Sequence, residues 1–331
     1  MTQLSYIVRR SVQIGISMKR KTKTMIALAA ITTTTIHVIN KIQYARYAET
    51  DFLSETENFY YEWRFGKVCY TKTGKGSPIL LIHDLSVGSS GYEFRKLMDS
   101  LAQSHEVYTL DLLGYGSSDK PNMTYTNFLY VQLVTDFIKN VIGKKTNVVT
   151  SGDSSSIAAM VAHNDPEVIS NLIFINPENL YHCNQIPSKQ TKMLKFFIEL
   201  PIFGTFVFNL FTTRAYFENV FENKYFDNIN NIEEKDILSY LESSHKKGYS
   251  DKYSYASYLS NYMNANIVHA LKEINNSILI IAGEKKEESE TIVENYIYYN
   301  NSIETTYIKN TKQLPHLEKP EEVLEQLSTF L

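Results

Sequence analysis

The sequence is poor in cysteine, in tryptophan and in net charge. Its 331 residues contain only two cysteines, Cys69 and Cys183, and two thiols form neither a disulfide framework nor a four-thiolate metal site. Lysine and arginine number 33 against 36 aspartates and glutamates, which gives a net charge of -3. A chain with this balance lacks the basic surface of a nucleic-acid-binding protein.

A long, uninterrupted apolar run is also lacking. Residues 19–24 are basic (KRKTKT) and residues 25–39 are mildly apolar, which is the layout of a signal or anchor segment. The apolar run is shorter than the roughly 20 residues that a membrane span needs, and no cleavage pattern follows. The sequence predicts an uncleaved, membrane-associated segment over residues 1–50, the alternative being an amphipathic helix docked on a cytoplasmic domain. Met18 directly precedes the basic stretch, and we expect translation to start there.

Short buried strands alternating with helical patterns occupy most of the remaining chain. Continuous apolar runs of four to eight residues suit strands that are buried on both faces of a parallel sheet. Such runs occur at 79–83, 107–112, 146–151, 171–177 and 277–283, flanked by more polar strands at 65–71 and 305–310. Helical patterns fall at 92–102, 127–142, 155–164 and 320–331. The alternation predicts an α/β fold with a mostly parallel, doubly wound sheet.

Aromatic residues are abundant, and many of them lie in one interruption of this alternation. The chain has 24 tyrosines and 17 phenylalanines. Residues 179–272 are helical by pattern and crowded with these side chains. We therefore expect a helical lid at 179–272, inserted after the sixth strand of a core formed by residues 58–178 and 273–331.

Three motifs in order carry a resemblance to a known family. LLIHD at 80–84, DLLGYGSSDKP at 111–121 and LPHLEKPEEVLEQL at 314–327 resemble the corresponding segments of the α/β-hydrolase superfamily. The resemblance covers about residues 60–331, and it is to Gram-positive α/β-hydrolase-like proteins with a basic, apolar N-terminal segment. The resemblance implies a nucleophile on a tight strand-to-helix elbow, followed along the chain by an acid and a histidine.

The positions that carry this chemistry are substituted. A gapless alignment of the elbow places Gly152 at the nucleophile, Lys286 at the acid and Gln313 at the histidine. Glycine has no nucleophilic atom, and the glutamine amide does not titrate near neutral pH. Asp84 replaces a family glycine, and its carboxylate would oppose oxyanion stabilisation if it faced inward.

A rearranged triad is the other interpretation. Shifting the elbow by two residues makes Ser154 the nucleophile, with His316 as base and Glu287 as the orienting acid. Glu178 is an alternative acid. The oxyanion hole would then use the backbone N–H groups of Leu85 and Ser155. The structural alternatives are that the serines cap a helix, that His316 is a core residue and that the glutamates lie on a solvated loop.

Two functions remain open. The first is a serine hydrolase or esterase with a degenerate triad, acting on a small apolar ester or acyl substrate. The second is a catalytically inactive homologue that binds an apolar ligand or a partner under the lid. The sequence shows neither a metal-ligand cluster nor a dinucleotide fingerprint, so we expect no metal and no cofactor. The expected partners are a small apolar molecule and a membrane surface, without nucleic acid.

Overall fold

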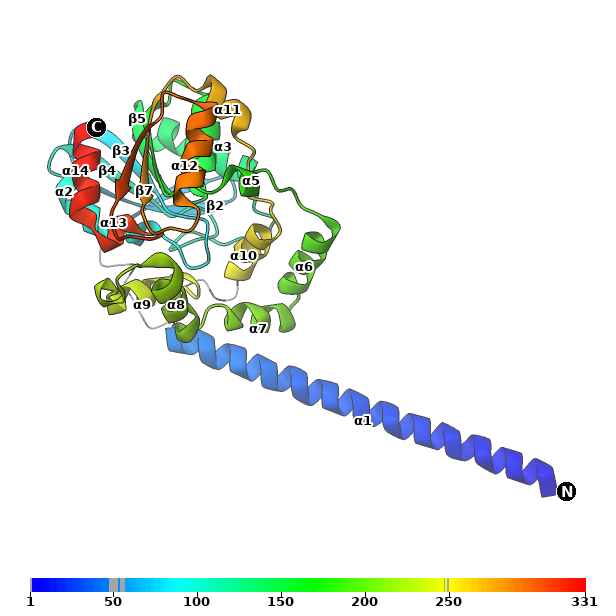
Figure 1. Ribbon diagram of the computed structural model, residues 1–331. Helices are drawn as coiled ribbons and strands as arrows, with labels where there is room; N and C mark the ends of the chain where they lie inside the picture. Colours follow the sequence, from blue (N-terminus) through cyan, green and yellow to red (C-terminus); the bar gives the residue numbers. More distant parts are fainter. Residues whose placement is uncertain (1, 48–52, 54–56, 247, 249) are drawn as a thin grey trace.

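A mostly parallel sheet with helices on both faces forms the centre of the protein, and one long helix projects from it (Figure 1). The computed structural model describes residues 2–47, 53, 57–246, 248 and 250–331. In this part of the chain eight strands lie in the order β1-β2-β4-β3-β5-β6-β7-β8. The strands are β1 (Asn58–Trp63), β2 (Gly66–Gly74), β3 (Ser77–Ile82), β4 (His105–Leu110), β5 (Thr146–Ser151), β6 (Ile169–Ile175), β7 (Ser277–Gly283) and β8 (Glu304–Ile308).

Only β2 runs antiparallel to its neighbours among these strands; it pairs with β1 and β4, and the other pairs are parallel. β1 was not among the strands predicted from the sequence. Only Tyr60 and Glu62 of β1 are exposed and Trp63 is buried, but the polar Asn58 and Glu62 limit its apolar run to three residues. The predicted mostly parallel α/β sheet is confirmed.

The central strands are buried on both faces because successive side chains point to opposite sides of the sheet. In β3, Leu80 and Ile82 pack in one cluster with α3 (Asn127–Phe137) and α4 (Ser154–Asn164). Ile79 and Leu81 pack in the opposite cluster with α2 (Arg95–Leu101) and α14 (Pro320–Phe330). This two-sided burial explains the continuous apolar runs in the sequence.

A helical insertion separates β6 from β7, as predicted. It consists of α5 (Leu180–Cys183), α6 (Lys189–Glu199), α7 (Phe203–Leu210), α8 (Arg214–Val220), α9 (Glu234–Ser243), α10 (Asp251–Leu259) and α11 (Val268–Glu273). The insertion has its own apolar clusters, in which Phe217 and Phe221 pack on Tyr240, and Phe208 packs on Tyr255. α12 (Ser289–Tyr299) and the short α13 (Pro315–Glu318) complete the core.

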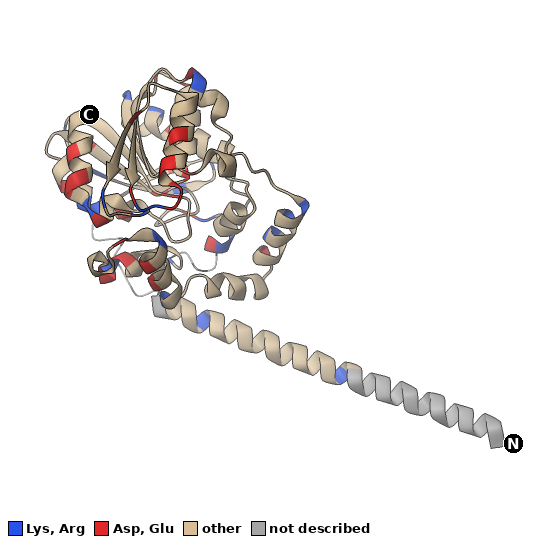
Figure 2. Ribbon diagram, in the orientation of Figure 1, with Lys and Arg blue, Asp and Glu red and all other residues tan. Residues whose placement is uncertain are grey.

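The N-terminal helix α1 (Thr2–Tyr47) extends away from the rest of the chain (Figure 1). Within its stretch Thr22–Ala45, an 18-residue window reaches a mean hydropathy of 1.4 and is almost entirely exposed. Few charged residues mark this part of α1 in Figure 2, and residues 24–40 contain none. The apolar helix is therefore longer than the run at 25–39 indicated, long enough to serve as a membrane anchor or as a signal sequence. Residues 48–50 of the predicted N-terminal segment lie outside the described residues.

Candidate functional site

The carboxyl ends of the parallel strands meet beneath the helical insertion, where a cavity of about 690 Å³ opens. Its floor comes from the loops after the strands and includes Asp84, Asp153, Glu178, Lys286 and Gln313. Its walls come largely from α8 and α10 and are rich in aromatic rings: Tyr216, Phe217, Tyr225, Tyr255 and Tyr258. A charged floor under an aromatic cover suits a ligand with a polar head and an apolar body.

The elbow between β5 and α4 turns at Gly152. This residue has φ +58°, in the left-handed region that glycine adopts without a Cβ penalty. β5 ends at Ser151 and α4 begins at Ser154, so only Gly152 and Asp153 make the turn. In a nucleophile elbow this sharp turn is where the reactive side chain stands.

The Asp84 carboxylate occupies the space beside Gly152. An ideal Cβ added to Gly152 would lie 2.5 Å from Asp84 Cγ, closer than real Cβ atoms approach other heavy atoms. Asp84 Oδ1 accepts hydrogen bonds from the backbone N–H groups of Leu85, at 2.8 Å, and Asp153, at 2.9 Å. With Gly152 in the nucleophile position, these are the two N–H groups of an oxyanion hole. A carboxylate of the chain itself therefore fills the hole.

The two predicted oxyanion donors, Leu85 N and Ser155 N, have different partners. Leu85 N, one of the two expected donors, donates to Asp84 Oδ1. Ser155 N instead donates to the Gly152 carbonyl oxygen at 3.2 Å, inside the turn that starts α4. Asp153 supplies the second N–H, because the elbow lies at Gly152 and the residue after it faces the cavity.

Ser154 and His316 lie away from the described lining of the cavity. Ser154 is fully buried, and its Oγ donates to the carbonyl oxygens of Ser151, at 2.8 Å, and Ile82, at 3.2 Å. His316 is also fully buried, and its ring stacks on Phe94 with centroids 5.0 Å apart. The structure thus places the two residues in the interior, each in a different packing environment.

His316 faces Glu93 in this interior. Their nearest atoms, Nε2 and Oε1, are 3.8 Å apart, and among the described residues neither side chain has a hydrogen-bond partner. Burial, together with the charges of Arg95 and Lys96, lowers the pKa of His316 to about 3. Burial raises the pKa of Glu93 well above its usual value. Both shifts favour the uncharged forms, so this contact is not an ion pair.

The residues assigned to the acid and histidine positions do border the cavity. Lys286 Nζ donates to the Pro177 carbonyl oxygen at 2.9 Å, and burial lowers the pKa of its amine. Gln313 lines the cavity and accepts a hydrogen bond at its backbone oxygen from Asn176 Nδ2 at 2.9 Å. Glu287 and Glu178, the two candidate acids, also line it.

Two residues that the sequence analysis did not single out shape the floor. Asp153 accepts a hydrogen bond at Oδ2 from Tyr258 OH at 3.0 Å, and burial, with the charges of Asp84 and Glu178, raises the pKa of Asp153 well above its usual value. Asn176, at φ +48°, donates to the Lys312 carbonyl oxygen and accepts from Gly283 N, both within 2.8 Å. It joins the ends of β6, β7 and β8. An asparagine before a proline at a strand end was the available signal.

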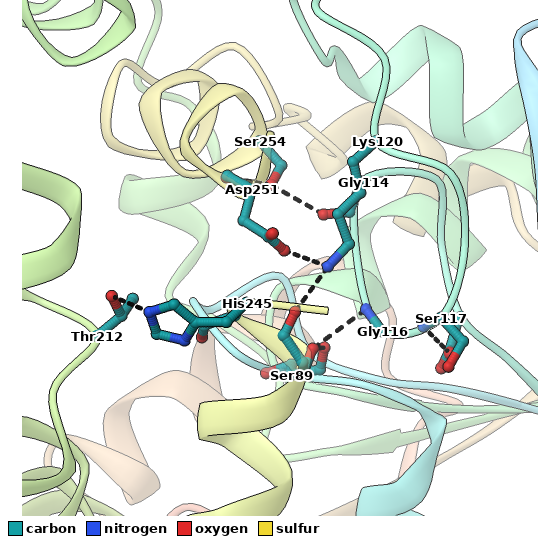
Figure 3. Close-up of polar contacts among 12 residues, drawn as sticks. Ser89, Gly114, Gly116, Ser117, Lys120, Thr212, His245, Asp251 and Ser254 are labelled. Carbon is teal, nitrogen blue, oxygen red and sulfur yellow. Dashed lines mark hydrogen bonds and ion pairs between the residues drawn. The ribbon is translucent and has the colours of Figure 1, made fainter. Parts of the chain in front are cut away.

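The turn at residues 111–121 fastens the insertion to the core (Figure 3). Lys120 Nζ donates to the Ser243 carbonyl oxygen at 2.6 Å and forms a buried ion pair with Asp251. Ser254 Oγ donates to the Gly114 carbonyl oxygen at 3.0 Å. Because these partners lie in α9 and α10, the turn holds the aromatic wall in place over the floor.

One group of side chains among the described residues has the spacing of metal ligands. Ligand atoms of His163, His269 and Glu273 lie within 4.8 Å of one another. They belong to α4 and α11 and are partly or fully exposed, and none of them lines the cavity. The candidate site itself is built from carboxylates, an amine and backbone groups.

The sheet order, the elbow after β5 and the helical insertion after β6 define an α/β-hydrolase fold. A sequence profile of the alpha/beta hydrolase family matches residues 79–326. This match covers most of the chain, and the protein belongs to the α/β-hydrolase family.

Curated relatives align over shorter segments. A 2-hydroxy-6-oxo-6-(2'-aminophenyl)hexa-2,4-dienoic acid hydrolase of Metapseudomonas resinovorans is 32% identical over 115 residues, which are 34% of this chain and 39% of that protein. A soluble epoxide hydrolase of Corynebacterium sp. is 25% identical over 107 residues, 32% of this chain and 37% of that protein. The chain therefore aligns with less than half the length of these relatives.

Solved structures show the same fold over far more of the chain. A serine hydrolase involved in carbazole degradation superposes with a TM-score of 0.67 at 16% identity, covering 83% of this chain and 98% of that one. A bacterial membrane phospholipase A superposes with a TM-score of 0.66 at 16% identity, covering 99% of this chain and 96% of that one. At these identities the likeness establishes the fold alone.

Proposed function

We propose that the protein binds a small molecule in the cavity under its lid and does not cleave it by serine-hydrolase chemistry. The carrying observation is the pairing of Gly152 with Asp84. The elbow has no nucleophilic side chain, and the chain's own carboxylate occupies the two N–H groups that would stabilise an oxyanion. An oxyanion hole contributes to catalysis only when it is free to receive charge as it develops.

The floor of the cavity supports binding through a polar head group. The raised pKa of Asp153 favours its neutral acid, which can donate a hydrogen bond to a ligand oxygen. Lys286 is a second titratable group on the same floor, and burial lowers the pKa of its amine. Tyr225 and Tyr255 supply apolar ring surface for the body of the ligand. The sequence predicted a small apolar ligand, and this lining adds a polar head group to that expectation.

A fluorophosphonate probe with mass mapping tests the missing nucleophile. We expect no adduct on the wild-type chain, because Ser154 Oγ is buried and donates to two carbonyl oxygens. A stoichiometric adduct on Ser154, lost in Ser154→Ala, would overturn the proposal.

Binding is tested with dansylamide, a small fluorophore that combines an apolar ring with a polar head. Val220 lines the cavity, so Val220→Trp should fill part of it and weaken dansylamide binding by about tenfold. Ile229→Trp is the matched control, because Ile229 is exposed and lies outside the described lining. Equal binding by both variants would contradict a ligand site in this cavity.

Hydrolysis is the second candidate function, and the relatives named as hydrolases favour it. In this case Ser154 would attack, His316 would act as base and Glu287 or Glu178 would orient it. That mechanism requires Ser154 and His316 to leave their interior positions and reach the cavity. Hydrolysis of p-nitrophenyl acetate that is lost in both Ser154→Ala and His316→Gln would support this candidate over the binding function.

We also propose that α1 anchors the protein in a membrane. The stretch Thr22–Ala45 is apolar and exposed along nearly its whole length, as expected for a helix surrounded by lipid. Carbonate extraction of membranes from expressing cells tests this proposal. The full chain should stay in the pellet, and its release into the supernatant would contradict an anchor.

A further inference from the structure

Several large apolar side chains of the lid are exposed on neighbouring helices. They lie on α6, on α7 and just after α7, and we call them the lid face: Met193, Phe196, Phe197, Phe203, Leu210 and Phe211. Phe196 is 61% exposed, Leu210 54% and Phe203 49%. An apolar surface of this kind marks a contact with another protein or with a membrane.

The N-terminal helix is fixed to the same part of the lid. Asn40 Nδ2 donates to the Ile202 carbonyl oxygen at 3.1 Å, and Asn209 Nδ2 donates to Asn40 Oδ1 at 2.9 Å. Gln43 Nε2 donates to the Asn209 carbonyl oxygen at 2.9 Å. Asn40 is almost completely buried by these contacts, so α1 and α7 are joined at a defined point.

This junction sets how far the lid lies from a membrane crossed by α1. Asn40 is the last residue of the uncharged stretch 24–40, and Lys41 follows it directly. The junction therefore lies where the uncharged part of α1 ends, which is where a membrane-spanning helix meets the headgroups. Helices that lie in the plane of a membrane place their apolar face about 5–10 Å into the boundary between headgroups and acyl chains. The junction and such helices therefore lie at the same boundary of the membrane.

We propose that the lid face lies in the headgroup region of the lipid bilayer that α1 crosses, so that the lid rests on the membrane surface. This proposal rests on α1 being an anchor. The bilayer explains why the lid face is apolar. A polar Asn40 is tolerated in an apolar helix because its amide nitrogen and oxygen each have a hydrogen-bond partner in the lid. Lys189 and Lys192, exposed on α6, suit the phosphates of anionic headgroups.

The same arrangement brings the cavity close to the membrane. α6 and α7 are bonded to α10 and its end: Lys252 Nζ donates to the Leu200 carbonyl oxygen at 2.9 Å, and Ser260 Oγ to the Thr191 carbonyl oxygen at 2.8 Å. The opposite side of α10 carries Tyr258, which lines the cavity. One layer of helix therefore separates the ligand site from the lipid surface.

Site-specific labelling of the full chain tests the docking. Both native cysteines are buried, so a cysteine introduced on the surface can be labelled selectively with an environment-sensitive maleimide fluorophore. Phe203→Cys labels the lid face, and Leu210→Cys provides a second position on it. Phe128→Cys is the control, because Phe128 is 76% exposed on α3, on the sheet domain and outside the lid.

The labelled proteins are reconstituted in phosphatidylcholine–phosphatidylglycerol vesicles that contain lipids with quenchers on their acyl chains. We expect emission from positions 203 and 210 to shift to the blue and to be quenched about twofold or more beyond position 128. Flotation of the vesicles measures anchoring separately. Chains that float without preferential quenching would overturn the docking and leave the anchor standing.

Two other outcomes also count against the proposal. Failure to float would overturn the anchor and the docking together. A blue shift that depends on protein concentration in detergent, without quenching by the labelled lipids, would show that the lid face contacts a second copy of the chain instead of the bilayer.

Discussion

Single residues decide what the elbow can do. In the proposed site Gly152 offers no nucleophile, and the Asp84 carboxylate occupies the space beside it and accepts hydrogen bonds from Leu85 N and Asp153 N. Burial raises the pKa of Asp84, but the two N–H donors favour its charged form. Gly152 and Asp84 share one small volume, so we expect that replacing either residue alone does not restore catalytic activity.

Restoring a nucleophile therefore requires three changes. Gly152→Ser with Gln313→His should stay inactive, because the new Cβ would collide with Asp84 and the hole would remain filled. Adding Asp84→Gly should raise the initial rate on p-nitrophenyl acetate at least about tenfold over wild type, below the 10²–10⁴ that a well-placed general base contributes. Lys286, left in the acid position, limits the gain.

The informative comparison is between the double and the triple variant. Equal activity in the two would show that Asp84 does not block the site. A thermal melt of each variant should accompany the assay, since the buried Asp84 also ties the loop after β3 to the elbow.

The buried His316 predicts a pH dependence of stability. Its pKa is about 3 in the folded chain and near the ordinary 6.5 in the unfolded chain. The contribution of neutral His316 to the free energy of unfolding is therefore complete above pH 6.5. It is lost as the pH falls toward 3, because the unfolded chain binds the proton first. His316→Phe can keep the stack on Phe94. The free energy of unfolding of this variant, relative to wild type, should be about 2 kcal/mol higher at pH 5 than at pH 7.5.

Urea denaturation at both pH values measures this difference. Glu93 contributes with the opposite sign, because its raised pKa makes the folded chain bind a proton as the pH falls. Comparing the variant with wild type separates the two groups. The same free-energy difference at both pH values would refute a neutral, buried His316.

At the scale of elements, the turn at residues 111–121 carries the lid. Figure 3 shows Lys120 directed at Asp251 of α10, and the same amine donates to the Ser243 carbonyl oxygen of α9. The sequence motif that indicated the family thus acts here as a fastening, since its lysine and glycine backbone bond to lid residues far along the chain. α10 in turn positions Tyr258 against Asp153.

Breaking the ion pair from one side should be costly. Lys120→Met leaves Asp251 buried without its partner, and removing one member of a buried pair destabilises a protein by about 3–5 kcal/mol. The double variant Lys120→Met with Asp251→Leu should recover much of this loss, because no uncompensated charge remains. Thermal or urea unfolding of the three proteins measures the effect, and a double variant less stable than the single one would contradict it.

At the scale of the whole molecule, lid and sheet share buried charges. Arg95 of α2 pairs with Asp236 of α9, and Lys120 of the core pairs with Asp251 of α10. Two parts joined in this way expose unpaired charges if one unfolds without the other, so they should unfold together.

A single cooperative transition is the expected result. Trp63, the one tryptophan, lies in β1 and reports on the sheet, while far-ultraviolet circular dichroism includes the helices of the lid. Their unfolding midpoints in urea should coincide. An earlier loss of helix signal, before Trp63 fluorescence changes, would show that the lid is an independent unit.

The sequence by itself determined the fold and the place of the insertion. Buried strands leave continuous apolar runs, and tight turns need glycine at set positions, so local patterns at 79–83 and 111–121 were enough to predict the sheet and the family. β1 was missed because the polar Asn58 and Glu62 limit its apolar run to three residues. The same local patterns pointed to Gly152, Lys286 and Gln313 as the positions to examine.

Only the tertiary structure decided what surrounds those positions. The inward turn of Asp84, the burial of Ser154 and His316 and the junction of Asn40 with α7 join residues distant in sequence. No periodicity or spacing encodes them, because the direction of a side chain after a strand depends on how separate loops pack against one another. Whether a polar residue faces a cavity or a core is settled by that packing, and with it the chemistry that the site can perform.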